Sequence, residues 1–173
     1  MQPVSLFDEA LIPADVNVPI GMRARPLRLD DYSKGFLQLL EQLTSVGHVS
    51  QSDFEQRFMS MKEAKSYYIV VLEDIELERV AAAATLVIEF KFIHNAGSRG
   101  RVEDVVVDQQ FRGQKLGAVL NNILVDMAKK IGVYKLSLEC KDELINFYKK
   151  YGYEKDVNFM VQRFDKPSQL QLQ

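Results

Sequence analysis

The stretch that decides the fold is residues 101–117, RVEDVVVDQQFRGQKLG. An apolar run carries two adjacent carboxylates, Glu103 and Asp104, and is followed by a polar turn and then by glycines and basic residues that open a long amphipathic segment. This order is typical of a strand that ends in a loop with accessible backbone N–H groups, where the next helix N-terminus points at an anion. The stretch therefore predicts a strand, a phosphate-binding turn and a helix, with paired carboxylates a short distance upstream.

Composition limits the class of protein. The 173-residue chain has 22 Lys and Arg against 24 Asp and Glu, so its net charge of −2 gives no overall basic field for nucleic acid or an anionic membrane. The single cysteine, Cys140, excludes an intramolecular disulfide, and no array of Cys and His suits a metal. Neither a signal-peptide pattern nor an apolar segment of roughly 20 residues is present. We expect a soluble, cytoplasmic protein with no metal site and no integral membrane segment.

Hydrophobic periodicity predicts an α+β domain with a mixed sheet. Strands are expected at 22–27, 67–72, 80–90, 101–107 and 134–140, and a last hairpin at 153–154 and 158–164. Helices are expected after Asp30 or Asp31, from Ser50 to Lys65, and at 113–131 and 142–151. The order lacks the regular βαβ alternation of a Rossmann fold. The expected organisation is an N-terminal arm at 1–20, one domain at 21–166 and a polar tail at 167–173.

The turn at 112–117 is the first candidate site. Glycine permits close approach of the backbone, and the helix behind it supplies N–H donors and a partial positive charge. A tight strand-to-helix connection that binds nothing is the alternative, so the surrounding motifs decide. Glu103 and Asp104 also have a simple explanation from pattern alone. Neighbours on a strand point to opposite faces, so both carboxylates cannot lie in a core, and a solvent-exposed edge would accommodate them.

Several separated motifs resemble the GNAT acetyltransferases. They are VEDVVV at 102–107, the turn at 112–117, LSLEC at 136–140 and NFYKKYGY at 146–153. Three further motifs, QLT at 42–44, KFIH at 91–94 and QRF at 162–164, are similar to those of the glucosamine-6-phosphate N-acetyltransferases. The resemblance runs from about Arg25 to Phe164. It implies a GNAT fold, a twisted mixed β-sheet with helices on both faces and a splayed central strand pair that holds acetyl-CoA.

The resemblance also implies an activity. The acetyl group would pass directly, in a ternary complex, from acetyl-CoA to the amine of D-glucosamine 6-phosphate, giving N-acetyl-D-glucosamine 6-phosphate for UDP-N-acetylglucosamine biosynthesis. An acetyl-cysteine route through Cys140 is less favoured, because both histidines lie far from it in sequence. Similar enzymes are homodimers whose C-terminal strand can reach the partner, which would bring Arg163 to the partner subunit's site.

Site residues follow from the same resemblance. Acetyl-CoA would be bound by Val105, Val106, Val107, Arg112, Gly113, Gln114, Lys115, Leu116, Gly117 and Tyr148. The sugar phosphate would be bound by Thr44, Lys91, Phe92, Ile93, His94, Glu103, Asp104, Val105 and Arg163. Tyr148 would assist departure of the CoA thiolate, and Glu139 would orient the amine.

Two positions depart from the family pattern. Lys115 stands where the usual turn has glycine, and Leu144 stands where the usual helix has Asn. Two alternatives therefore remain, a GNAT enzyme for another small amine and a catalytically silent module that binds CoA or a sugar phosphate. Polyamine sites require several carboxylates and no phosphate-binding cations, so the basic cluster of Lys91, His94 and Arg163 favours a sugar phosphate.

Overall fold

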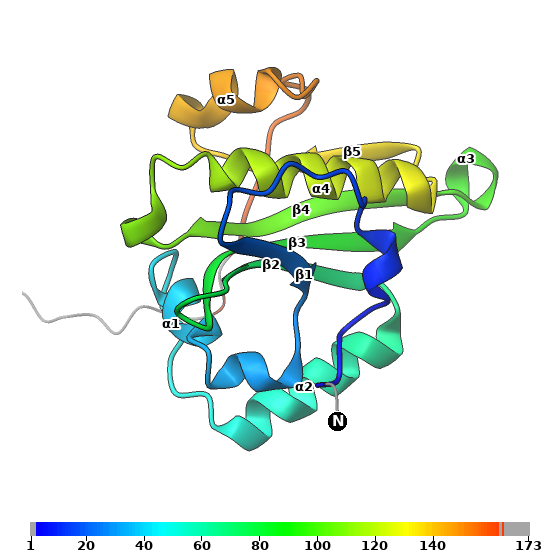
Figure 1. Ribbon diagram of the computed structural model, residues 1–173. Helices are drawn as coiled ribbons and strands as arrows, with labels where there is room; N and C mark the ends of the chain where they lie inside the picture. The colour runs from blue at the N-terminus through cyan, green and yellow to red at the C-terminus, as the bar shows by residue number, and fades with distance from the viewer. Residues whose placement is uncertain (1–2, 163, 165–173) are drawn as a thin grey trace, which may run out of the picture. The chain divides into compact units, whose positions relative to one another are not determined.

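The computed structural model describes residues 3–162 and 164 (Figure 1). The chain divides into two compact units, Met1–Leu138 and Glu139–Gln173. The first unit contains a five-stranded sheet in the order β1-β2-β3-β4-β5, which follows the order of the strands along the chain. Within the described part of the chain, no helix is long and apolar enough to cross a bilayer.

The sheet is mixed, as predicted. Its strands are β1 (Met22–Pro26), β2 (Tyr67–Asp74), β3 (Arg79–Phe90), β4 (Ser98–Val107) and β5 (Lys135–Leu138). The first four pair antiparallel, including the predicted β2–β3 hairpin, and β5 pairs parallel with β4. β2 and β3 are buried along most of their length because both faces of the sheet are covered.

Helices cover the two faces of the sheet (Figure 1). On one face, α4 (Leu116–Ile131) packs Leu120, Ile123 and Met127 into a core with β2 and β3. On the other face, α1 (Phe36–Glu41) and α2 (Gln51–Ala64) form a second core with Val71 and Val106. The remaining helical segments are η1 (Glu9–Leu11), η2 (Leu29–Tyr32), α3 (Ile93–Ala96), η3 (Gln109–Phe111), η4 (Asp142–Leu144) and α5 (Ile145–Lys149).

Local signals set the ends of the longer helices. The Ser50 side chain accepts a hydrogen bond from the Asp53 N–H, while the Asp53 carboxylate accepts one from the Ser50 N–H, so the predicted start of α2 is confirmed. α4 ends at Gly132, whose φ of +86° allows its N–H to bond the carbonyls of Ala128 and Lys129. This end was also predicted.

A buried ion network joins β1 and β2 to the segment before α1. The guanidinium of Arg25 donates to both carboxylate oxygens of Asp31, at 2.7 and 2.8 Å, and to Glu73 at 2.7 Å. Arg25 and Asp31 are fully buried. Lys34 adds a contact to Glu73 at 2.9 Å. The network therefore holds η2 and the start of α1 against the edge of the sheet.

The N-terminal segment packs against the two cores of the first unit, of which it is a part. The N–H of Leu6 bonds the carbonyl of Leu27 at 2.8 Å, and Leu6 is buried in the core beneath α1 and α2. Phe7, Val16 and Val18 contact the core beneath α4. These apolar contacts explain how residues without helical or strand periodicity take a defined path.

The predicted last hairpin at 153–154 and 158–164 is wrong for the described residues. No strand forms among them beyond β5, and no backbone hydrogen bond joins 153–162 to another segment. Val157, Met160 and Phe164 are exposed by 82%, 91% and 85%. Alternating apolar residues form a strand only where a neighbouring backbone accepts the pairing, and the described chain offers none to this segment.

Candidate functional site

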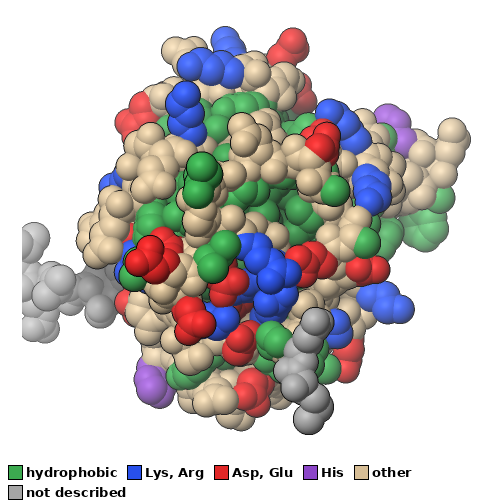
Figure 2. Space-filling view, viewed as in Figure 1, with side chains coloured by type: hydrophobic (Ala, Val, Ile, Leu, Met, Phe, Trp, Pro, Cys, Tyr) green, Lys and Arg blue, Asp and Glu red, His purple; other side chains and the backbone are tan. Residues whose placement is uncertain are grey.

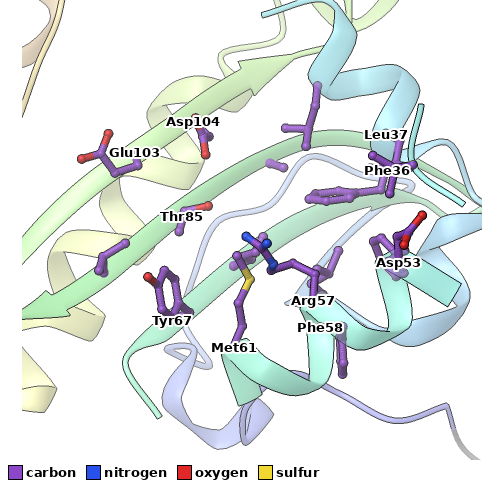
Figure 3. A pocket seen from close by; sticks show the side chains of 17 residues that line it. Phe36, Leu37, Asp53, Arg57, Phe58, Met61, Tyr67, Thr85, Glu103 and Asp104 are labelled. Carbon is purple, nitrogen blue, oxygen red and sulfur yellow. The ribbon is translucent and has the colours of Figure 1, made fainter. Parts of the chain in front are cut away.

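A pocket of about 570 Å³ lies between α1, α2 and the sheet of the first unit (Figure 3). Apolar side chains from both helices form much of its wall. A smaller set of polar residues lines it from α2, β2, β3 and β4 (Figure 3): Asp53, Arg57, Tyr67, Thr85, Glu103 and Asp104. An apolar pocket with a few convergent polar groups is the usual form of a small-molecule site.

A β-bulge in β4 brings both predicted carboxylates to this pocket. Ala83 pairs with Val106 and Thr85 pairs with Glu103, so Asp104 and Val105 together oppose the single residue between Ala83 and Thr85. Asp104 has φ of +50°, which breaks the alternation of side chains. Both residues line the pocket and neither lies in the core, because Asp104 is exposed and Glu103 is only partly buried.

The two carboxylates differ in their surroundings. Glu103 accepts hydrogen bonds from Arg101, with its oxygen 2.9 Å from Nε and 2.8 Å from a terminal nitrogen. Asp104 is exposed and has no ion pair among the described residues. Figure 2 shows Lys and Arg interspersed with Asp and Glu over the viewed face. The charge that a ligand meets at the surface therefore depends on which side chains lie near it, and not on the net charge of the chain.

The turn between β4 and α4 has the geometry expected of an anion site. Gly113 and Lys115 have φ of +85° and +61°, which turns the chain sharply into the N-terminus of α4. No side chain of the described residues caps that terminus, and Gly113 has open space where a Cβ would stand. Uncapped N–H groups, the partial positive charge of a 16-residue helix and the exposed Arg112 and Lys115 together fit a diphosphate.

Beside this turn, the edge of β4 extends beyond its pairing with β5. β5 pairs with β4 only from Arg99↔Lys135 to Val102↔Leu138, whereas β4 continues to Val107. The backbone from Glu103 onward therefore has no parallel neighbour within the first unit. A strand edge that opens next to an anion-binding turn can pair with an extended ligand.

The mixed sheet, the splayed strands and the turn agree with comparisons to known proteins. The family model described as Acetyltransferase (GNAT) family matches residues 31–153. The chain belongs to the GNAT acetyltransferase family. The predicted GNAT fold and acyltransferase class are thereby confirmed.

GNAT relatives with a named substrate cover most of the chain. It is 47% identical over 147 residues to a probable glucosamine 6-phosphate N-acetyltransferase of Drosophila melanogaster, covering 83% of this chain and 67% of that protein. It is 38% identical over 144 residues to the glucosamine 6-phosphate N-acetyltransferase of Arabidopsis thaliana, covering 83% and 97%. The crystal structure of an Arabidopsis thaliana glucosamine-6-phosphate N-acetyltransferase superposes with a TM-score of 0.81 at 38% identity, covering 83% of this chain and 99% of that one.

The loop at 91–94, predicted to bind the sugar phosphate, does not line the pocket of this GNAT chain. Lys91 pairs with Glu89 at 2.6 Å, and the His94 ring stacks on Tyr134 with centroids 4.1 Å apart. Phe92 is fully exposed and Ile93 is 62% exposed. Thr44 also lies outside the pocket lining, in the exposed loop after α1. Arg163 lies outside the described residues.

The two predicted catalytic residues belong to the second unit. Tyr148 packs edge-on against Phe147 and Tyr153, with ring centroids 5.0 and 5.8 Å apart. Burial raises the pKa of the Tyr148 phenol, and nearby Cys140 raises it further, so the phenol keeps its proton at neutral pH. Glu139 is exposed at the start of this unit. No group of three or more His, Cys, Asp or Glu among the described residues could hold a metal ion.

Sequence reasoning missed four polar residues of the pocket. Arg57 is exposed and points from α2 toward the pocket interior (Figure 3), while Asp53, Tyr67 and Thr85 lie in the lining. Arg57 sits beside the apolar positions Phe54, Phe58 and Met61, whose spacing did mark the inward face of α2. That spacing was the available signal, but a lone arginine beside it is more commonly a solvated side chain.

Lys115 is a strained position at which stability and cofactor affinity should respond in opposite directions. Lys115→Gly should raise the free energy of unfolding by up to about 1 kcal/mol, because glycine adopts a left-handed conformation without a Cβ penalty. The lost charge should weaken CoA binding by about two- to fivefold at low salt and less at high salt. Denaturant unfolding and calorimetric titration of CoA would measure both effects.

Lys115→Ala is the matched control, because it removes the charge and retains the left-handed strain. It should show the weaker CoA binding without the gain in stability. Equal CoA affinity of Lys115→Ala and the wild type at low salt would remove this side chain from cofactor binding.

Proposed function

We propose that this chain transfers the acetyl group of acetyl-CoA to the amine of D-glucosamine 6-phosphate, giving N-acetyl-D-glucosamine 6-phosphate and CoA. The observation that carries the proposal is the pocket lined by Glu103 and Asp104, because the strand β4 that holds both carboxylates leads into a turn that suits an anion. Relatives named for this reaction, at 38–47% identity over 83% of the chain, support the substrate. The product is a precursor for UDP-N-acetylglucosamine.

Acetyl-CoA fits the turn and the splayed edge of β4. Its diphosphate would accept hydrogen bonds from the N–H groups at the start of α4, with Arg112 and Lys115 adding charge. The backbone of Val105 and Val107 would pair with the extended arm of the cofactor. When bound, the cofactor supplies an acyl group activated as a thioester. The chain's own contribution is to hold that group beside the carboxylate pair.

The acceptor would bind through the carboxylates of β4. Glu103 and Asp104 can accept hydrogen bonds from the amine and hydroxyls of the sugar, which presents many donors. Arg101 occupies one oxygen of Glu103, which leaves the other oxygen of that carboxylate and the exposed Asp104 for the ligand. The phosphate group of the sugar requires cations to bind it, and the planar guanidinium of an arginine is well suited to this.

We infer a homodimer from proposed sugar-phosphate residues, Lys91 and His94, that do not line the pocket. Lys91 and His94 lie on a loop whose apolar neighbours Phe90, Phe92 and Ile93 are exposed by 73%, 100% and 62%. Residues 157–161 expose further apolar side chains in the second unit. A second copy would cover such surfaces and could receive Lys91, His94 and Arg163 at its own site.

Tyr148 and Glu139 are the proposed catalytic residues. A phenol that stays protonated at neutral pH can donate its proton to the departing thiolate, so that the amine's acetylation is not reversed by a bare sulfur nucleophile. Glu139 would orient the attacking amine. A cytoplasmic location is part of the proposal.

The first experiment is a thiol assay of CoA release, with acetyl-CoA and glucosamine 6-phosphate compared against glucosamine, spermidine and a peptide. We expect rapid turnover only with the phosphorylated sugar, and a product mass that corresponds to its N-acetyl form. Turnover with a different amine would retain the GNAT activity and reject the sugar site. Binding of CoA without turnover on any amine would identify a silent module.

A further inference from the structure

Gln42 joins two segments that the proposed function assigns to different substrates. Its side-chain Nε2 donates to the Asp108 carboxylate at 3.1 Å, and its Oε1 accepts from the Gln109 backbone N–H at 2.9 Å. The partners lie 66 and 67 residues away along the chain. Both polar ends of one amide are thus used in a single bridge across the first unit.

On one side of this bridge is the acceptor pocket. Gln42 caps the C-terminus of α1, whose residues Phe36, Leu37 and Leu40 line the pocket. The loop that follows leads through Thr44 to Val49, which also lines it. A shift of Gln42 would therefore displace the wall of the pocket and the entry to α2.

On the other side of the bridge is the start of the anion-binding turn. Asp108 directly follows β4, and its carboxylate also accepts from the Gln110 N–H at 2.8 Å. Its own N–H bonds the Ala81 carbonyl at 2.9 Å. Asp108 caps the short helix η3, which ends at Phe111. Phe111 is buried, and the Arg79 guanidinium lies over its ring. Asp108 thus sets the path of the chain into the turn, and Gln42 holds Asp108 from the pocket side.

We propose that Gln42 is a positioning residue that couples binding of CoA at the turn to binding of the aminosugar in the pocket. The inference rests on the proposed function, because it takes the pocket as the acceptor site and the turn as the CoA site. A ligand that orders the turn orders Asp108 and Gln109, and through the Gln42 amide it orders the end of α1. By linkage, each ligand then raises the affinity for the other by the same factor. For a bridge of two partly solvated hydrogen bonds, a factor of about three to ten is expected.

The coupling can be measured without turnover, because CoA carries no acetyl group to transfer. The dissociation constant of glucosamine 6-phosphate is measured by calorimetric titration with and without saturating CoA. In the wild type, CoA should tighten sugar binding by about three- to tenfold. In Gln42→Ala this factor should fall close to one, while each ligand alone binds within about twofold of its wild-type value. A role in stability alone would leave the factor unchanged.

Two further variants separate the bridge from general damage to α1. Gln42→Glu retains an acceptor for the Gln109 N–H but places a second carboxylate against Asp108, so the coupling should be lost. Adding Asp108→Asn to Gln42→Glu supplies a donor to the new carboxylate and should restore part of the coupling. Gln38→Ala is the matched control, because Gln38 is an exposed glutamine of α1 with no side-chain hydrogen bond among the described residues.

Wild-type coupling retained in Gln42→Ala, or a wild type without coupling, would overturn the inference. A failure of the proposed function is seen separately, as absence of turnover by the wild type with acetyl-CoA and glucosamine 6-phosphate. In that case the same titrations, run with the amine that does turn over, still decide whether Gln42 couples the two sites. Thermal melting of each variant shows that the compared proteins are folded.

Discussion

Tyr148→Phe should lower kcat by on the order of 10²-fold and leave KM for acetyl-CoA and the aminosugar within about twofold. Phenylalanine retains the edge-on ring contacts to Phe147 and Tyr153, so packing of the second unit should be preserved. The variant loses the proton that the phenol holds at neutral pH and that, in the proposed mechanism, passes to the departing thiolate. Steady-state kinetics with both substrates varied would separate kcat from KM.

Tyr153→Phe is the control for this substitution. The Tyr153 hydroxyl is buried without a hydrogen-bond partner among the described residues, and burial raises its pKa. Its removal takes away an unsatisfied polar group, so turnover should stay near the wild-type value and stability should not fall. Equal turnover of Tyr148→Phe and the wild type would remove Tyr148 from the mechanism.

Asp31→Ala should lower the free energy of unfolding by about 3–5 kcal/mol, because it leaves the buried Arg25 guanidinium with only part of its counter-charge. Arg25 would lose its hydrogen bonds to both oxygens of Asp31 and retain the one to Glu73. In a domain of this size such a loss should lower Tm by on the order of 10 °C. Urea unfolding and differential scanning calorimetry would measure it.

Asp30→Ala is the matched control for the buried network. Asp30 neighbours Asp31 and pairs with Lys34 at 3.2 Å, but its side chain is 36% exposed. A solvated pair of this kind contributes about 0–1 kcal/mol. Losses of equal size in the two variants would show that burial does not set the strength of the network.

The same network should shape acid unfolding. Hydrogen bonding from Arg25, joined by Lys34, lowers the pKa of Glu73 from 4.5 to about 2. A lowered folded-state pKa contributes stability that is fully present above the unfolded value and is lost as pH falls through the folded one. Stability attributable to Glu73 should thus decline between about pH 4.5 and 2. In Glu73→Gln this part of the pH dependence should be absent, and an unchanged acid limb would contradict the assignment.

Much of the fold could be predicted because its signals are local. The Ser50–Asp53 cap, the glycine that ends α4 and the β2–β3 hairpin each depend on residues close together in sequence. The same holds for the turn between β4 and α4, where the end of a strand, a glycine and the start of a helix lie close together in sequence. The last hairpin failed because alternation reports only that residues suit a strand, and a strand also needs a partner.

The sequence by itself determined the order of elements as far as α5 and the turn between β4 and α4. It also marked Glu103 and Asp104 as unusual residues in an apolar strand. Only the tertiary structure decided how these groups meet. Pairing of β4 with β3 produces the bulge at Asp104, and both carboxylates line the pocket beside it. Packing of α1 and α2 over the sheet brings Arg57 to the same pocket and Gln42 to Asp108. Register and contacts across many residues depend on the assembled sheet, so no local pattern of residues encodes them.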